Sequence, residues 1–150
     1  MNWATRFPSP RGPALARASP WRSHVPISAP PSRLPAVIGI IDDDPLARAA
    51  TEMLVRSLGY ITRSFASAEA FLLKDCGAIC IVSDVQMPRM SGFDLQRALN
   101  RQGNKVPVIL VTGFADDAAR AVAMQLGAVA LLPKSDTAEH LGGAICAALG

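Results

Sequence analysis

Short apolar runs alternate with amphipathic segments along the chain, beginning near residue 36. The run 36–41, Ala-Val-Ile-Gly-Ile-Ile, is typical of a strand buried on both faces. Asp44 followed by Pro45 is typical of a helix N-cap with proline in the first turn, and Gly59 is placed to end that helix. The helix face expected to point toward the core comprises Leu46, Ala50, Met53, Leu54 and Leu58.

The alternation of strand and helix repeats four more times. Ser67 is expected to cap a second helix that extends to Leu73. Ser91, with Asp94 three residues later, resembles the capping box of a third helix. Gly127 is placed to end the fourth. The other expected strands are 60–65, 78–83, 106–111 and 128–132. The expected core positions of the last two helices are Ala119, Val122, Ala123, Leu126, Leu141, Ala144, Ile145 and Ala148. Five alternating strands and helices predict an α/β protein, with a doubly wound parallel sheet covered by helices on both faces.

Residues 1–35 have a different composition from the rest of the chain. They contain eight of the twelve prolines, both tryptophans and five arginines, with no acidic residue. We expect a disordered Pro- and Arg-rich tail, while a transit peptide or a misassigned translation start are alternatives. Residues 36–150 hold ten basic and twelve acidic residues. The net charge of +3 is therefore a property of the tail and does not indicate nucleic-acid binding by the folded part.

Two further classes are disfavoured by the sequence. The longest apolar run, 106–114, is interrupted by polar residues and is far shorter than the roughly 20 residues of a membrane helix. The three cysteines, Cys76, Cys80 and Cys146, lack the paired spacing of a zinc site. We expect them to be buried, reduced thiols of a cytosolic protein without a membrane span.

Polar side chains follow four of the expected strands. Asp42 and Asp43 follow the first, Asp84 the third, Thr112 the fourth and Lys134 the fifth. The carboxyl ends of parallel strands meet at one edge of a sheet, so these side chains are expected to converge. Two carboxylates about 4 Å apart repel by roughly 4 kcal/mol at an effective dielectric near 20. Such a cluster must hold a cation, bind a proton or be strained, and a hard divalent ion with oxygen ligands, such as Mg²⁺, answers this best.

These segments resemble the receiver domain of response regulators in two-component systems, particularly its FixJ-like branch. The most specific match is 83–92, Ser-Asp-Val-Gln-Met-Pro-Arg-Met-Ser-Gly, which resembles the phosphoacceptor loop. Further matches are 41–45 with the acid-pair segment, 67–72 with the second helix, 111–113, and 127–129 followed by Lys134. The resemblance covers about residues 36–150. It implies a flavodoxin-like (βα)5 fold with strand order 2-1-3-4-5 and a cytoplasmic location.

The resemblance also implies a role for each site residue. Asp84 would be the phosphoacceptor, and its phosphoryl group would come from a sensor histidine kinase or a phosphotransfer protein. Lys134 would pair with the phosphoryl group, Thr112 would donate its hydroxyl to it, and Gly113 would leave room for the phosphodonor. The implied Mg²⁺ ligands are Asp42, Asp43, Asp84 and the backbone carbonyl of Gln86.

Three positions depart from the family pattern or add to it. Leu131 stands where the family often has an aromatic residue, and Ser135 follows the lysine where proline is usual. Both departures affect signal transmission more than phosphorylation. Phe114, two residues after Thr112, is hypothesised to shield the phosphoryl group from water and prolong its lifetime. Equal dephosphorylation rates of the wild type and Phe114→Ala would refute that hypothesis.

The resulting expectation is a single-domain response regulator that is not an enzyme. FixJ-like regulators commonly carry a DNA-binding domain after the receiver, and the sequence ends at Gly150. Output is therefore expected through a protein target, without nucleic acid or membrane. One alternative is a degenerate receiver that acts only as an interaction module. Another is a small phosphohydrolase of the haloacid-dehalogenase type, although Gln86 occupies the position of that family's second acid.

Overall fold

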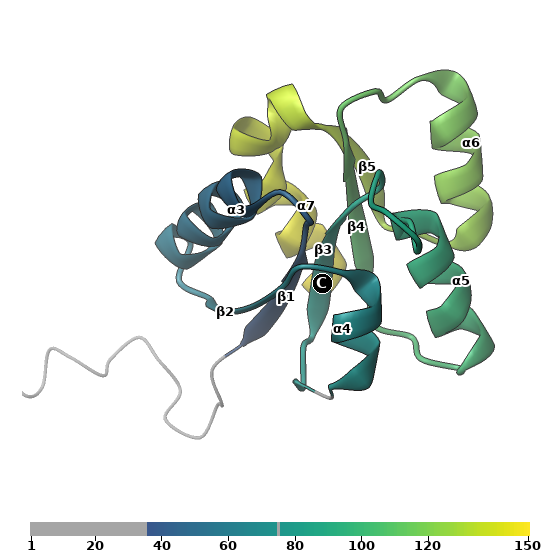
Figure 1. Ribbon diagram of the computed structural model, residues 1–150. Helices are drawn as coiled ribbons and strands as arrows, with labels where there is room; N and C mark the ends of the chain where they lie inside the picture. The colour runs from purple at the N-terminus through teal and green to yellow at the C-terminus, as the bar shows by residue number, and fades with distance from the viewer. Residues whose placement is uncertain (1–35, 75) are drawn as a thin grey trace, which may run out of the picture. The chain divides into compact units, whose positions relative to one another are not determined.

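The computed structural model describes residues 36–74 and 76–150, and the expected tail 1–35 lies outside the described residues. In the described part, strands and helices alternate as predicted (Figure 1). The strands are β1 (Val37–Ile41), β2 (Ile61–Phe65), β3 (Cys80–Asp84), β4 (Val108–Thr112) and β5 (Ala130–Pro133). The helices are α3 (Pro45–Ser57), α4 (Ala68–Leu73), α5 (Gly92–Arg101), α6 (Asp117–Leu126) and α7 (Thr137–Leu149), with the 3₁₀ turn η2 (Lys134–Asp136) before α7.

The five strands form one parallel sheet in the order β2-β1-β3-β4-β5, which confirms the predicted flavodoxin-like topology. Alternate residues of the central strands point to opposite faces. On one face Ile40, Val82 and Ile109 pack with α3 and α7. On the other, Ile81 and Leu110 pack with α4, α5 and α6. Figure 1 shows the two groups of helices on opposite sides of the sheet.

The predicted helix ends are confirmed. The Asp44 carboxylate accepts a hydrogen bond from the Leu46 N–H, and the Ser67 hydroxyl accepts one from the Ala70 N–H. Ser91 and Asp94 form a reciprocal capping box at α5. Gly127 ends α6 with φ +86°, a left-handed conformation that favours glycine because it lacks a Cβ. Local side-chain chemistry therefore fixes where these helices begin and end.

The predicted core-facing side of α3 is wrong in part. Leu46 and Met53 are 81% and 70% exposed, whereas Val55, outside the predicted face, is fully buried. Ala50 and half-buried Leu54 of the predicted face line a cavity of about 290 Å³ between α3, α7 and the sheet, together with Ala47 and Thr51. Since alanine fits either a buried or an exposed position, the Ala-rich sequence of this helix defines its rotation poorly.

The cysteine prediction holds only in part. Cys80 is buried, but Cys76 is partly exposed and Cys146 is exposed, and all three are free. Burial raises the pKa of the Cys80 thiol to about 11, which keeps that thiol protonated and unreactive. As for membranes, the described residues contain no helix of the length and apolar character needed to span one.

Gly92, at the start of α5, lies against the backbone that follows β3. A Cβ at this position would be 2.5 Å from the Asp84 carbonyl oxygen and 3.0 Å from the Val85 Cα. Because both neighbours are backbone atoms, Gly92→Ala is expected to lower the free energy of unfolding by about 1–3 kcal/mol in urea denaturation. Gly143→Ala in α7 is the control, since its Cβ would meet nothing within 4 Å. That variant should be stabilised by up to about 1 kcal/mol; an unchanged Gly92→Ala would contradict the close contact.

Candidate functional site

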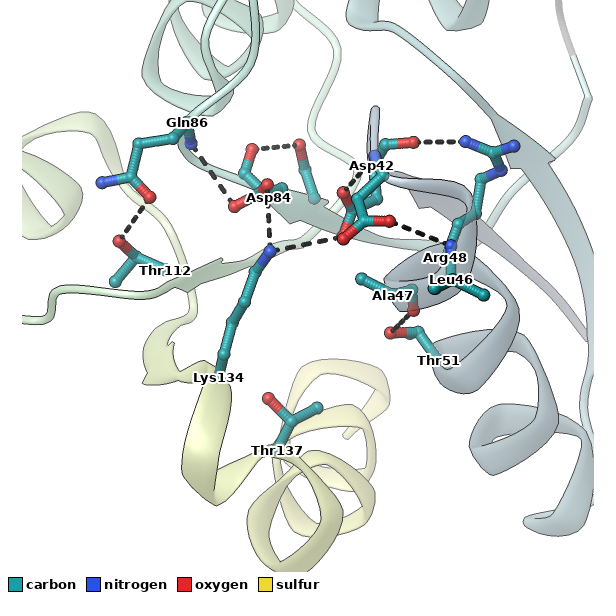
Figure 2. A network of polar contacts seen from close by, with 12 residues as sticks. Asp42, Leu46, Ala47, Arg48, Thr51, Asp84, Gln86, Thr112, Lys134 and Thr137 are labelled. Atoms are coloured by element: carbon teal, nitrogen blue, oxygen red, sulfur yellow. Dashed lines mark hydrogen bonds and ion pairs between the residues drawn. The ribbon is translucent and has the colours of Figure 1, made fainter.

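The site lies at the carboxyl ends of β1, β3, β4 and β5. Asp42 directly follows β1, Asp84 and Thr112 are the last residues of β3 and β4, and Lys134 follows β5. Because β1 and β3 are neighbours in the sheet, the acids that follow them are brought side by side. Figure 2 shows Asp42, Asp84 and Lys134 pointing toward one another from three separate elements.

Three carboxylates converge at this edge, as the sequence predicted. One oxygen from each of Asp42, Asp43 and Asp84 lies within 4.8 Å of the others, close enough to ligate a single ion. Asp42 and Asp84 are buried, while Asp43 is exposed. A set of carboxylate oxygens with one solvent-facing member fits a hard divalent cation such as Mg²⁺, which keeps part of its hydration shell.

Lys134 is the cation that the structure pairs with these acids. Its Nζ lies 3.3 Å from Asp84 Oδ2 and 3.7 Å from Asp42 Oδ2. Burial alone would lower the pKa of Lys134, but the Asp84 and Asp42 carboxylates outweigh it and raise the pKa above its ordinary value. The ammonium group therefore stays charged at neutral pH and partly offsets the charge of the two acids.

The negative charge around Asp84 is only partly compensated by its ion pair with Lys134. Burial and the Asp42 carboxylate raise the pKa of Asp84, and the opposing effects of Lys134 and of the Gln86 N–H do not cancel them. One lysine therefore does not balance three carboxylates. This excess negative charge is the physical reason to expect a bound divalent cation.

The raised pKa of Asp84 gives a pH-dependent stability in metal-free protein. The folded state binds this proton more tightly than the unfolded chain, whose pKa is near 3.8. Proton binding by Asp84 therefore stabilises the folded state at low pH, and this stabilisation is lost as the pH rises through the pKa of Asp84 in the folded protein. In EDTA at neutral pH, Asp84→Asn is expected to raise the free energy of unfolding. We expect a gain of roughly 1–4 kcal/mol, the repulsion of two carboxylates at dielectrics of about 80 to 20.

Urea denaturation at neutral pH and at progressively lower pH would measure this gain, which should shrink as the pH falls because a growing fraction of wild-type Asp84 is protonated. Asp44→Asn, at an exposed acid of the same loop, is the control and should show no such gain. A gain for Asp84→Asn that does not depend on pH would contradict the electrostatic explanation.

Arg48 contributes to the site, although its role was not among those predicted from the sequence. Its Nη1 donates a hydrogen bond to the Asp42 backbone carbonyl at 2.6 Å, and the Asp44 N–H donates to Asp42 Oδ1 at 2.9 Å. Together these bonds hold the loop after β1 and orient the Asp42 carboxylate. The spacing in the sequence could have indicated this contact. Arg48 lies one helical turn after the Asp44 N-cap, which places it beside the loop that follows β1.

Thr112 contacts the site through the side chain of Gln86, a contact that the sequence did not indicate. Its Oγ1 lies 3.2 Å from Oε1 of Gln86, and the Gln86 N–H donates to Asp84 Oδ1 at 3.4 Å. The expectation that the Gln86 carbonyl ligates Mg²⁺ stays a prediction. A Cβ on Gly113 would meet nothing within 4 Å, so there is open space at that position. The Phe114 side chain is 71% exposed, and its shielding of a phosphoryl group also stays a prediction.

The loop from Asp84 to α5 is held in place by an ion pair to α4 and by a backbone hydrogen bond within the loop. Arg89 adopts a φ of +66°, a left-handed conformation that is uncommon for a residue with a Cβ. Its Nε lies 3.2 Å from Glu69 Oε2, which links the loop to α4. The Gly92 N–H donates to the Val85 carbonyl at 2.9 Å and closes the turn. These contacts fix the path of the backbone that carries Gln86.

Comparison with known proteins agrees with this architecture. Residues 38–145 match the model of the response regulator receiver domain. The response regulator protein TmoT of Ectopseudomonas mendocina is 41% identical over 117 residues, which cover 76% of this chain and 53% of that protein. The transcriptional regulatory protein FixJ of Azorhizobium caulinodans is 38% identical over 124 residues, which cover 80% of this chain and 57% of that protein.

A solved structure is similar over the same region. The crystal structure of FixJ-N has a TM-score of 0.70 and 30% sequence identity, over 77% of this chain and 94% of that one. The chain spans about half the length of the curated relatives it matches. The family match, the strand order and the acid cluster agree, and the chain therefore belongs to the response regulator receiver domain family of two-component systems.

Proposed function

We propose that this protein is a phosphorylation switch that accepts a phosphoryl group on Asp84 from a sensor histidine kinase or a phosphotransfer protein. The observation that carries the proposal is the position of the Asp84 carboxylate. It lies within the cluster formed with Asp42 and Asp43, and Lys134 Nζ is 3.3 Å from its Oδ2. Such a group is a nucleophile whose surroundings favour added negative charge once a cation is present.

The reaction needs little covalent chemistry from the protein. A carboxylate oxygen of Asp84 attacks the phosphorus, the new O–P bond forms as the N–P bond of a phosphohistidine breaks, and the imidazole nitrogen retains the electron pair. Lys134 stabilises the charge on the phosphoryl oxygens, and Thr112 donates its hydroxyl to one of them. Mg²⁺ held by Asp42, Asp43, Asp84 and the Gln86 carbonyl would supply further charge compensation.

The consequence of phosphorylation is a rearrangement that a partner recognises. The added dianion draws the Thr112 hydroxyl and its loop toward Asp84 and biases the nearby surface between two states. We propose that the output is a protein–protein contact made in the cytoplasm. This receiver would accept its phosphoryl group stoichiometrically, as a signalling protein does, and not turn over substrate as an enzyme.

Nucleic-acid binding by the folded part is not expected. Residues 36–150 carry an excess of two acidic residues, and this net charge does not favour binding to the phosphate backbone of a nucleic acid. The relatives include proteins described as transcriptional regulators, and this chain covers about half of their length. A sequence-dependent, salt-resistant shift of DNA by the purified protein would overturn this part of the proposal.

Incubation with acetyl phosphate and Mg²⁺, followed by intact-mass measurement, tests the proposed function against its alternatives. A gain of one phosphoryl group that is lost on treatment with hydroxylamine would support the receiver. Sustained release of phosphate from a phosphate ester would instead support the phosphohydrolase. No modification would support the degenerate receiver. A parallel incubation in EDTA should show no gain if the acid cluster acts through a divalent ion.

A further inference from the structure

The Gln86 side chain holds the hydroxyl group of Thr112 in this structure. Thr112 Oγ1 accepts a hydrogen bond from the Phe114 N–H at 3.1 Å. It also lies 3.2 Å from Gln86 Oε1, a contact drawn in Figure 2. Because Gln86 Oε1 is an acceptor without a proton, the hydroxyl must donate in this contact. The Phe114 carbonyl oxygen, at 3.4 Å, is the more distant acceptor. The single proton of the Thr112 hydroxyl is therefore directed toward Gln86.

The same residue also contacts the proposed phosphoacceptor. The Gln86 backbone N–H donates to Asp84 Oδ1 at 3.4 Å, while its side chain extends to Thr112 on the adjacent strand. Asp84 pairs in register with Val111, so Thr112 ends β4 one residue beyond the level of Asp84. One residue thus joins the carboxylate of β3 to the hydroxyl of β4, through its backbone and its side chain respectively.

This geometry creates a competition for one proton. In the proposed function Thr112 donates its hydroxyl to a phosphoryl oxygen on Asp84. A hydroxyl has one proton, so donation to the phosphoryl group and donation to Gln86 exclude each other. A hydrogen bond to a charged oxygen is roughly twice as strong as one to a neutral amide oxygen, so a phosphoryl group can displace Gln86. The net free energy that the phosphoryl group gains from the Thr112 hydroxyl is reduced, because the hydrogen bond between Thr112 and Gln86 must first break.

We propose that Gln86 is a positioning residue that retains the Thr112 hydroxyl in the unphosphorylated protein and so opposes switching. This inference rests on the proposed function and deepens it. Gln86 is exposed, so water can take the place of Thr112 as the partner of its side-chain amide, whereas Thr112 is buried. Loss of such a bond is expected to change the affinity for a phosphoryl-like anion by about 2- to 10-fold.

The test is a double-mutant cycle with beryllofluoride and Mg²⁺ as the probe. Gln86→Met keeps the length of the side chain and removes the acceptor, while the backbone N–H and carbonyl remain. It is expected to bind beryllofluoride about 2- to 10-fold more tightly than the wild type in an NMR titration. In a Thr112→Val background, Gln86→Met is expected to change nothing further, because no hydroxyl is left to release.

A second readout needs neither ligand nor metal. Three-bond scalar couplings of the Thr112 side chain in the ligand-free protein report the position of Oγ1 about χ1. Gln86→Met is expected to shift these couplings, since the hydroxyl loses its nearer acceptor and keeps only the more distant Phe114 carbonyl oxygen. Gln125→Met, the same substitution at an exposed position of α6, is the matched control and should change neither the couplings nor the affinity.

The outcomes separate this inference from the proposed function. Equal tightening by Gln86→Met in the Thr112 and Thr112→Val backgrounds would overturn the inference, because the effect would then not pass through the hydroxyl. Wild-type binding of beryllofluoride with no difference for Gln86→Met, or unchanged Thr112 couplings, would also overturn the inference alone. Failure of the wild type to bind beryllofluoride would overturn the proposed function and the inference with it.

Discussion

Asp84→Asn is expected to acquire no phosphoryl group from acetyl phosphate and Mg²⁺ under conditions in which the wild type becomes fully labelled. The Asn side chain has the same shape as Asp but is neutral, and its amide oxygen is a poor nucleophile toward phosphorus. The substitution also removes one carboxylate of the acid cluster and with it part of the predicted Mg²⁺ site. Intact-mass measurement over time gives the labelled fraction directly.

Asp44→Asn is the matched control for this experiment. Asp44 belongs to the same acidic segment, is exposed, and caps α3 through a hydrogen bond from the Leu46 N–H. Asparagine caps helices about as well as aspartate, so the variant should fold and be labelled like the wild type. Labelling of Asp84→Asn at Asp42 or Asp43, located by peptide mapping, would move the nucleophile to another member of the cluster.

The positions of the acids could be predicted because they depend on topology alone. Asp42 and Asp43 follow one apolar run, and Asp84 ends another. Once these runs are adjacent strands of a parallel sheet, as β1 and β3 are, the three acids must lie close together. Lys134 was predictable by the same rule, and its flexible side chain tolerates small errors in the position of β5. Rules that depend on strand order therefore located the charged part of the site.

Side-chain contacts within loops could not be predicted in this way. The bond between Gln86 and Thr112 depends on the path of the loop after Asp84, and that path depends on Gly92 and on the left-handed φ of Arg89. The prediction of which side of α3 faces the core failed for a related reason. Leu46 and Met53 belong to a regular apolar pattern, and the sequence contains no local signal that these two positions point to solvent.

Lys134→Met is expected to slow phosphorylation by acetyl phosphate by about 100- to 1,000-fold, the range found when one preorganised donor is removed from a charged transition state. Two effects contribute. The phosphoryl oxygens lose the ammonium group that would face them. The pKa of Asp84 also rises further, because Lys134 is a group that lowers it, so a smaller fraction of Asp84 is ionised at a given pH.

The pH dependence of the rate separates these two effects. If the pKa of Asp84 were the whole cause, raising the pH would restore the wild-type rate, because a raised carboxyl pKa withholds the ionised form only below that pKa. We expect only partial recovery, since the missing ammonium group is not replaced at any pH. Lys105→Met, at an exposed loop position, is the control and should react at the wild-type rate. A Lys134→Met variant that matches this control at every pH would show that the 3.3 Å contact between Lys134 and Asp84 has no part in the chemistry.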